Sequence, residues 1–88
     1  MHAVVVRVTI EDFDTAVRTL QEQVLPRVRQ APGVVAGYWL EPEGNQGMSI
    51  VVFEAEDAAR TAADRIELPS EGGVRLESVE VREVVASI

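Results

Sequence analysis

The segments of this sequence that have the composition of β-strands are apolar on both of their faces. The clearest spans residues 3–10, where only Arg7 and Thr9 are polar, and residues 33–40 and 48–53 are similar. A strand with one face in solvent alternates apolar and polar residues, whereas a nearly continuous apolar run is typical of a strand covered on both faces. A chain of 88 residues has too few helices to cover both faces of a sheet. We therefore expect a second molecule to cover one of them.

The length of the chain also favours association. At this size we expect one domain, residues 1–88, that buries only roughly 60 to 65 per cent of the surface its unfolded form exposes. The sequence contains no cysteine, so neither a disulfide nor a thiolate metal site can stabilise it. Association with another copy is the remaining common way to stabilise a domain of this size.

The charge of the chain argues against a nucleic-acid partner. The net charge is −7 and all eight cationic side chains are arginine, a balance that repels a phosphate backbone. No apolar run reaches the roughly 18 to 20 residues of a membrane span, and no signal-peptide pattern is seen at the N-terminus. We therefore expect a soluble, cytoplasmic protein with neither nucleic acid nor membrane as a partner.

An amphipathic helix is expected after the first strand, which spans residues 3–10 and is rich in β-branched side chains. Asp12 or Asp14 is placed to cap its first turn. Pro26 lies inside it, and because proline lacks an N–H and clashes with the carbonyl one turn back, we expect a kink or break near residues 22–25. The apolar residues that define the helix are three or four apart: Phe13, Val17, Leu20, Val24 and Val28.

The rest of the chain is expected to form a hairpin, a second helix and a last strand. A turn at residues 42–47 joins strands at 34–41 and 48–54, and a helix follows at about 56–67. A loop at 69–73 leads to a strand from 74 to about 85, whose mixed charge is typical of an exposed edge or of an extension that meets a partner. The inward positions of the second helix are mostly alanine, which lets it lie close to a sheet: Ala58, Ala59, Ala62, Ala63 and Ile66.

The order of elements, βαββαβ, predicts an α+β, ferredoxin-like fold. Since sequential strands favour hairpins and crossovers are right-handed, we expect an antiparallel four-stranded sheet with two helices on one face. The other face is then bare and apolar, which marks an interface. A two-fold homodimer that closes sheet against sheet covers it. The candidates for this dimer face are Val5, Val51, Phe53, Val79 and Val81, with the opposite parity of the strands left open.

Three stretches carry a resemblance to a known family. They are the helix end Leu25-Pro26, residues 31–40 (APGVVAGYWL) and residues 52–59 (VFEAEDAA). With them the chain resembles, over essentially its whole length, the dimeric α+β-barrel superfamily and, within it, the antibiotic-biosynthesis-monooxygenase-like (ABM-like) domains. The resemblance implies a homodimer whose sheets form a barrel with the helices outside. It also implies a cavity for a small molecule between sheet and helices in each subunit.

The same resemblance bears on catalysis. Enzymes of this family oxygenate aromatic polyketides or quinols without a metal or flavin, so the resemblance implies no cofactor. Some relatives degrade haem. Their catalytic sets involve a strand asparagine, a tryptophan, and histidine, tyrosine or arginine donors. This chain departs from them, because its only asparagine is Asn45 in a turn and its only histidine is His2 at a terminus expected to fray. We assign no catalytic residue, no cofactor and no metal ligand.

Three side chains remain as candidates for a ligand pocket: Trp39, Tyr38 and Arg7. Trp39 and Tyr38 are adjacent on a strand, so they point to opposite faces and only one can line a given pocket. Each is either a packing anchor or an aromatic wall for a bound ring. Arg7 either pairs with Glu80 or Glu83 on the last strand or contacts an anion inside a cavity.

Three functions are compatible with the sequence. The first is a homodimeric α+β-barrel domain that binds itself and a small apolar or aromatic ligand. The second is a cofactor-independent monooxygenase acting on aromatic or quinol-type substrates, with Trp39 or Tyr38 and Arg7 in its cavity. The third is a ligand-sensing regulatory module.

Overall fold

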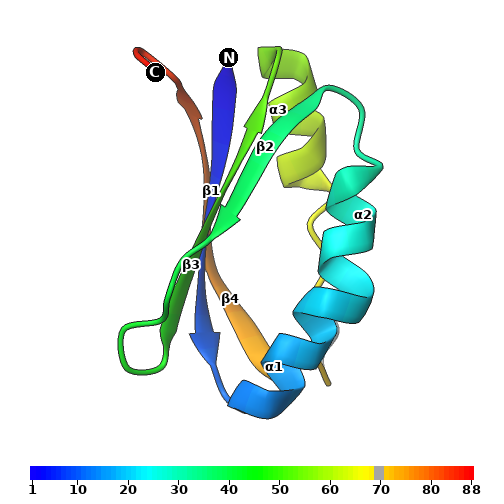
Figure 1. Cartoon of the computed structure of the whole chain (residues 1–88), viewed down its shortest axis with the longest axis vertical. Helices are drawn as coiled ribbons and strands as arrows, with labels where there is room; N and C mark the ends of the chain where they lie inside the picture. Colours follow the sequence, from blue (N-terminus) through cyan, green and yellow to red (C-terminus); the bar gives the residue numbers. More distant parts are fainter. Residues whose placement is uncertain (69–70) are drawn as a thin grey trace.

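A four-stranded antiparallel sheet with helices on one face makes up the computed structural model, which describes residues 1–68 and 71–88 (Figure 1). The predicted α+β architecture is confirmed, and the strand order β2-β3-β1-β4 is compatible with a ferredoxin-like fold. Pro69 and Ser70, part of the predicted loop, lie outside the described residues. The strands are β1 (His2–Ile10), β2 (Val34–Trp39), β3 (Gln46–Phe53) and β4 (Val74–Glu83).

The first helical segment is continuous but changes its winding before Pro26. It consists of α1 (Phe13–Thr19), a π-helical turn η1 (Leu20–Val24) and α2 (Leu25–Arg29). The Leu25 N–H donates to the Leu20 carbonyl five residues back, and Pro26 follows in the first turn of α2, where its missing N–H is tolerated. The disturbance predicted near residues 22–25 is thus present as a wider turn, and the helix does not break there.

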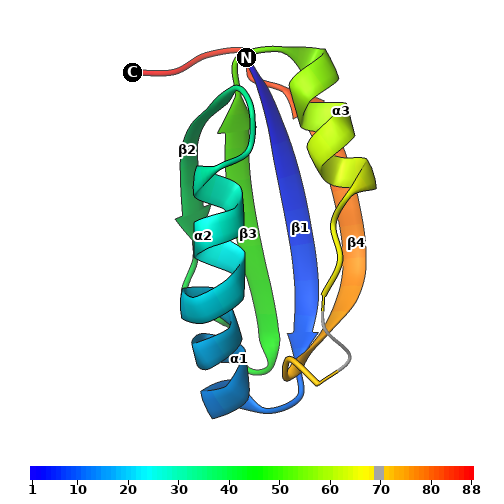
Figure 2. The same cartoon turned by 90° about the vertical axis from the view of Figure 1, so that its right-hand side faces the viewer.

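Helix α3 (Glu56–Asp64) is shorter than predicted and packs closely on the sheet. Ala59 is fully buried, and the other four predicted inward residues pack against the core. Because alanine side chains are short, the helix axis can approach the strands. Figure 2 shows α3 over the β1 and β4 side of the sheet and α2 over the β2 and β3 side.

The hydrophobic core lies between the sheet and the helices. In the register of β1, Val4 is paired with Val51 of β3 and with Val81 of β4, so these three side chains share one face. Val4 is only 2% exposed, which identifies this face as the one that the helices cover. The buried members of the core are Val4, Val51, Phe53 and Ala59.

This register corrects the predicted composition of the dimer face. Val51 and Phe53 belong to the core, and Val79 and Val81 pack against it, so these four residues face the helices. Val5 has the opposite parity and faces away from them. The grouping of Val5 with the other four is wrong because both parities of the strands are apolar, so alternation alone does not decide which parity faces the core. A partner contact for Val5 stays a prediction.

Strand β4 is an edge strand, as predicted, and contains a bulge that the sequence pattern did not reveal. Ser78 is paired with Arg7, but Leu76 is paired with Val8, which leaves Glu77 as the extra residue. The bulge changes the parity of β4, so that Leu76 shares a face with Val79 rather than with Ser78.

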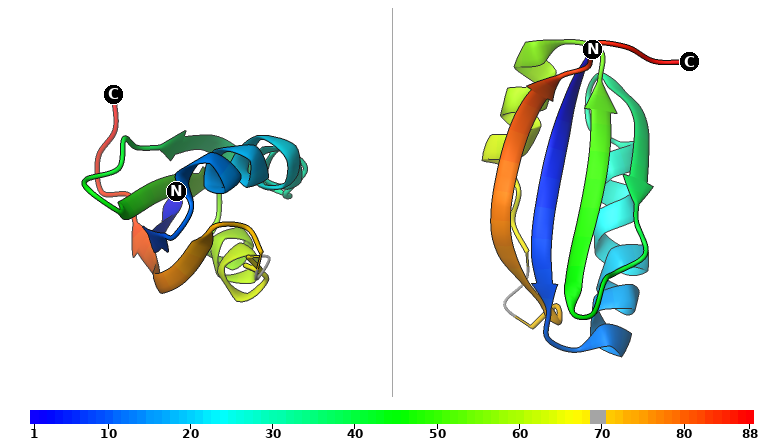
Figure 3. Two further views of the ribbon diagram at one scale, coloured as in Figure 1. Left: turned by 90° about the horizontal axis from the view of Figure 1, so that it is seen from below. Right: turned by 90° about the vertical axis from the view of Figure 1, so that its left-hand side faces the viewer.

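The face of the sheet turned away from the helices is here called the open face, and no helix of residues 1–68 and 71–88 lies in front of it (Figure 3, right). One row across it runs from Tyr38 through Ile50 and Val5 to Glu80. A parallel row runs from Ala36 through Val52 and Ala3 to Arg82. The open face is therefore apolar over β2, β3 and part of β1, and charged along β4.

Candidate functional site

A cavity of about 1030 Å³, partly open to solvent, lies between the sheet and the helices. Its lining is mostly apolar. The polar side chains among the described lining residues are Thr19, Gln23, Arg27, Gln30, Ser49, Asp57, Thr61, Asp64, Arg65 and Glu67. Sites for drug-sized ligands occupy roughly 300 to 1000 Å³, so this space is large enough for one. The floor consists of alternate residues of β1, and the walls include residues of both helical segments: Val4, Val6, Val8, Ile10, Leu20, Val24, Val28, Ala58 and Ala62.

The cavity arises because the two helical segments pack unequally on the sheet. The alanine-rich helix α3 packs against β1, β3 and β4. The longer segment contacts the sheet mainly where α2 meets β2. Figure 1 shows this segment near the sheet at α1, where the chain leaves β1, and standing away from β1 and β3 along α2. Apolar residues of this segment therefore face β1 across the cavity instead of interlocking with it.

The strands supply two aromatic side chains to this cavity, Trp39 of β2 and Phe53 of β3. Of these, Trp39 carries a polar N–H. It is paired with Ser49 of β3 on the helix-covered face, and both residues line the cavity. Tyr38 is paired with Ile50 on the open face and is 58% exposed. The prediction that these two neighbours cannot line one pocket is confirmed, and Trp39 is the one that lies at the cavity.

The position of the Trp39 ring is set by Gly37, which the sequence analysis did not single out. A Cβ atom at Gly37 would lie 2.9 Å from Cζ3 and 3.0 Å from Cη2 of Trp39. The six-membered ring therefore rests on the bare backbone of Gly37, two residues earlier on the same face of β2. A glycine inside a strand often marks such a close approach, so the Gly-x-Trp spacing was the available signal.

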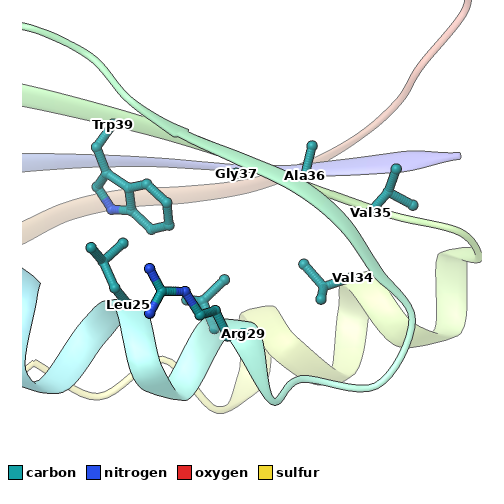
Figure 4. Close-up of a pocket in the computed structure, with 8 residues that line it drawn as sticks. Leu25, Arg29, Val34, Val35, Ala36, Gly37 and Trp39 are labelled. Carbon is teal, nitrogen blue, oxygen red and sulfur yellow. The ribbon is translucent and has the colours of Figure 1, made fainter.

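A second, smaller cleft of about 450 Å³ lies between α2 and the edge strand β2. Figure 4 shows Leu25 and Arg29 rising from the helix toward Trp39, with Val34 pointing down from the strand. Trp39 and Val28 line this cleft and also the larger cavity, so the two spaces adjoin. Arg29 was not among the predicted site residues.

Arg7 lies on the open face rather than in either cavity. Its guanidinium Nη1 is 3.2 Å from the Glu80 carboxylate, and both side chains are nearly half exposed. The predicted pairing with Glu80 is confirmed, whereas the alternative of an anion contact inside a cavity is wrong. The physical reason is parity, since Arg7 follows Val5 on the face that the helices leave open.

His2 is part of the sheet, because it is the first residue of β1 and is paired with Phe53 and Glu83. Its Nδ1 atom is buried and has no hydrogen-bond partner among the described residues. His2 lines neither the cavity nor the cleft. The geometry gives it no position from which to act as a base on a ligand in either space.

Three carboxyl groups have a lowered pKa, and all lie outside the cavity and the cleft. The N–H of Thr15 holds the pKa of Asp12 below its usual value at the start of α1. A hydrogen bond from Arg60 lowers the pKa of Glu56. The Thr9 hydroxyl, 2.7 Å away, and then Arg75 lower the pKa of Glu77. These shifts reflect surface pairing.

Among residues 1–68 and 71–88, no group of three or more histidine or acidic side chains is placed to hold a metal ion. Within the same residues no helix has the length and apolar character needed to cross a membrane. No protein-family model matches the chain, and no curated protein matches it.

Proposed function

We propose that this chain is a small-molecule-binding domain that holds an apolar or aromatic ligand in the cavity between sheet and helices. The observation that carries the proposal is the cavity itself, about 1030 Å³ with a mostly apolar lining. A domain this small gains most of its stability from close packing, so retaining such a space is costly unless a ligand occupies it. Trp39 supplies a flat aromatic wall and one N–H donor.

We further propose that the domain is a homodimer joined through the apolar part of the open face. Tyr38, Ile50, Val52 and Val5 lie next to one another there, and Tyr38 is 58% exposed. A contiguous exposed apolar patch marks an interaction site, and a two-fold contact covers it on both copies at once. The resemblance to ABM-like domains, noted from the sequence, supports the same arrangement.

The alternative of a cofactor-independent monooxygenase receives less support. That function needed Trp39 or Tyr38 to share a cavity with Arg7, and only Trp39 lies at the cavity. A ligand-sensing regulatory role uses the same cavity and stays a prediction. Binding is therefore the function that the geometry supports best.

Binding is tested by following the emission of Trp39, the only tryptophan, during titration with a neutral apolar probe such as para-butylbenzyl alcohol. Val8→Phe places a larger side chain on the cavity floor and should weaken binding at least about tenfold, because the added ring occupies the ligand's volume. Val85→Phe makes the same change at a residue that is 92% exposed and should leave affinity unchanged. Unaltered affinity in Val8→Phe would place the ligand elsewhere, and no binding of any apolar probe would refute the proposal.

A further inference from the structure

The cleft between α2 and β2 presents hydrogen-bond donors without a side-chain acceptor. Of the eight described residues that line it, only Arg29 and Trp39 have polar side chains. A guanidinium has five N–H donors and no acceptor, and an indole has a single N–H donor. A ligand that satisfies both groups must therefore supply acceptors.

Both donors are available for a ligand. Neither the Arg29 guanidinium nor the Trp39 indole N–H forms a side-chain hydrogen bond or ion pair with any of the described residues. Four other arginines, Arg7, Arg60, Arg75 and Arg82, each contact a carboxylate, whereas Arg18, Arg27 and Arg65 resemble Arg29 in forming no ion pair with the described residues. What distinguishes Arg29 is its place in the cleft beside Trp39. Figure 4 shows the Arg29 side chain extending into the space between Leu25 and Trp39.

The rest of the cleft is apolar, which restricts the ligand further. Leu25, Val28 and Val34 line the cleft together with the two donors, and Arg29 is itself exposed to solvent. A small hydrophilic anion has no apolar surface to bury here, so these contacts do not offset its loss of hydration. An anionic group attached to an apolar body buries that body against these side chains and also pairs with the two donors. Val28 and Trp39 also border the large cavity, so the apolar body of such a ligand contacts residues common to both spaces.

We propose that the cleft between α2 and β2 binds the carboxylate end of an amphipathic ligand, with Arg29 as its counter-ion and the Trp39 N–H as a second donor. A carboxylate matches the planar fork of a guanidinium and accepts several hydrogen bonds at once. This inference rests on the proposed binding function and narrows its ligand class from apolar compounds to apolar carboxylic acids.

The experiment compares two probes that share one apolar body, para-butylbenzoate and para-butylbenzyl alcohol, by calorimetry and Trp39 emission at neutral pH. The wild-type chain should bind the carboxylate at least about tenfold more tightly than the alcohol, and Arg29→Gln should remove about tenfold of that preference. Arg29→Lys keeps the charge and should retain part of it. Arg18→Gln removes the same charge from α1, outside both spaces, and should retain all of it.

The outcomes separate this inference from the function on which it rests. If both probes bind equally, or if Arg29→Gln keeps the full preference, the carboxylate site is refuted while the binding function stands. If Arg18→Gln loses as much preference as Arg29→Gln, the effect comes from overall charge and the site is again refuted. If neither probe binds, both proposals fail together.

Discussion

Replacing Gly37 with alanine tests whether the strand backbone sets the position of the Trp39 ring. The added Cβ would lie 2.9 Å and 3.0 Å from two carbons of that ring. Unstrained carbon atoms are about 3.5 to 4.0 Å apart, so the ring must move by roughly 0.5 to 1 Å. It can move only toward the cavity or the cleft, and both are sites where we expect ligand contacts.

The size of the effect on stability follows from two opposing terms. Overpacking in a protein interior costs about 1 to 3 kcal/mol, while exchanging glycine for alanine at a compatible position stabilises by about 0.4 to 1 kcal/mol through the unfolded chain. Because the ring borders open space, we expect the lower part of the overpacking range. The net loss in the free energy of unfolding should then lie between about 0 and 1 kcal/mol, with weaker binding of apolar probes.

A double-mutant cycle isolates the ring as the cause. In a Trp39→Leu background the clash is absent, so Gly37→Ala should be neutral or slightly stabilising, and the coupling energy should be about 1 to 2 kcal/mol. Urea unfolding followed by circular dichroism at a fixed protomer concentration measures it, since a dimer's stability depends on concentration. Gly47→Ala, whose Cβ would meet Val8 at 3.1 Å, is the control and should not couple to Trp39. An equal loss from Gly37→Ala in both backgrounds would refute the reasoning.

Three further predictions concern the open face and the surface charges. Ile50→Glu should convert the dimer to a monomer in gel filtration at micromolar concentration. The control is Phe13→Glu, which changes an exposed apolar residue on the helix layer and should leave the dimer intact. A wild-type chain that elutes as a monomer would contradict the interface. Arg7→Ala should lower the free energy of unfolding by less than about 1 kcal/mol and leave probe affinity unchanged, because the ion pair is exposed and outside the cavity; a selective loss of binding would contradict this. The pKa of Glu77 is lower in the folded chain than its ordinary value of 4.5, so its contribution to stability is present above that pH and is lost as the pH falls through the folded value. In Glu77→Gln, the free energy of unfolding measured in urea should therefore depend less steeply on pH in that range. An identical pH slope in Glu77→Gln and wild type would show that the pairing of Glu77 with the Thr9 hydroxyl does not stabilise the fold.

Local features of the sequence were sufficient to predict the elements and their order. The turn at residues 42–47, the alanine face of the second helix and the disturbance before Pro26 each follow from rules that act within a few residues. The opposite orientation of Tyr38 and Trp39 follows equally directly from the geometry of a strand. These predictions needed no knowledge of which strands pair.

Features that depend on pairing were not predictable. Val5 and Val51 are both apolar residues of central strands, and only the register places one on the open face and the other in the core. The bulge at Glu77 shifts the alternation of faces in β4, so that residues before and after it follow opposite parities. No alternation of apolar and polar residues in that strand indicated this shift. The pairing of Arg7 with Glu80 was predicted correctly, but its position on the exposed open face was not. Opposite charges on neighbouring strands predict a pair whichever face of the sheet is buried.

The position of Pro26 also affects the shape of the cavity, because it changes the winding of the helix that forms one wall. From Phe13 to Val28 the stripe advances fifteen residue positions in four turns, whereas four α-helical turns advance about 14.4. The wider turn η1, immediately before Pro26, takes up part of that excess and keeps Val28 in line with Phe13 on the side that borders the cavity. In a regular helix Val28 and Arg29 would be rotated relative to Phe13, so the orientation in which they line the cleft depends on the wider turn that precedes Pro26.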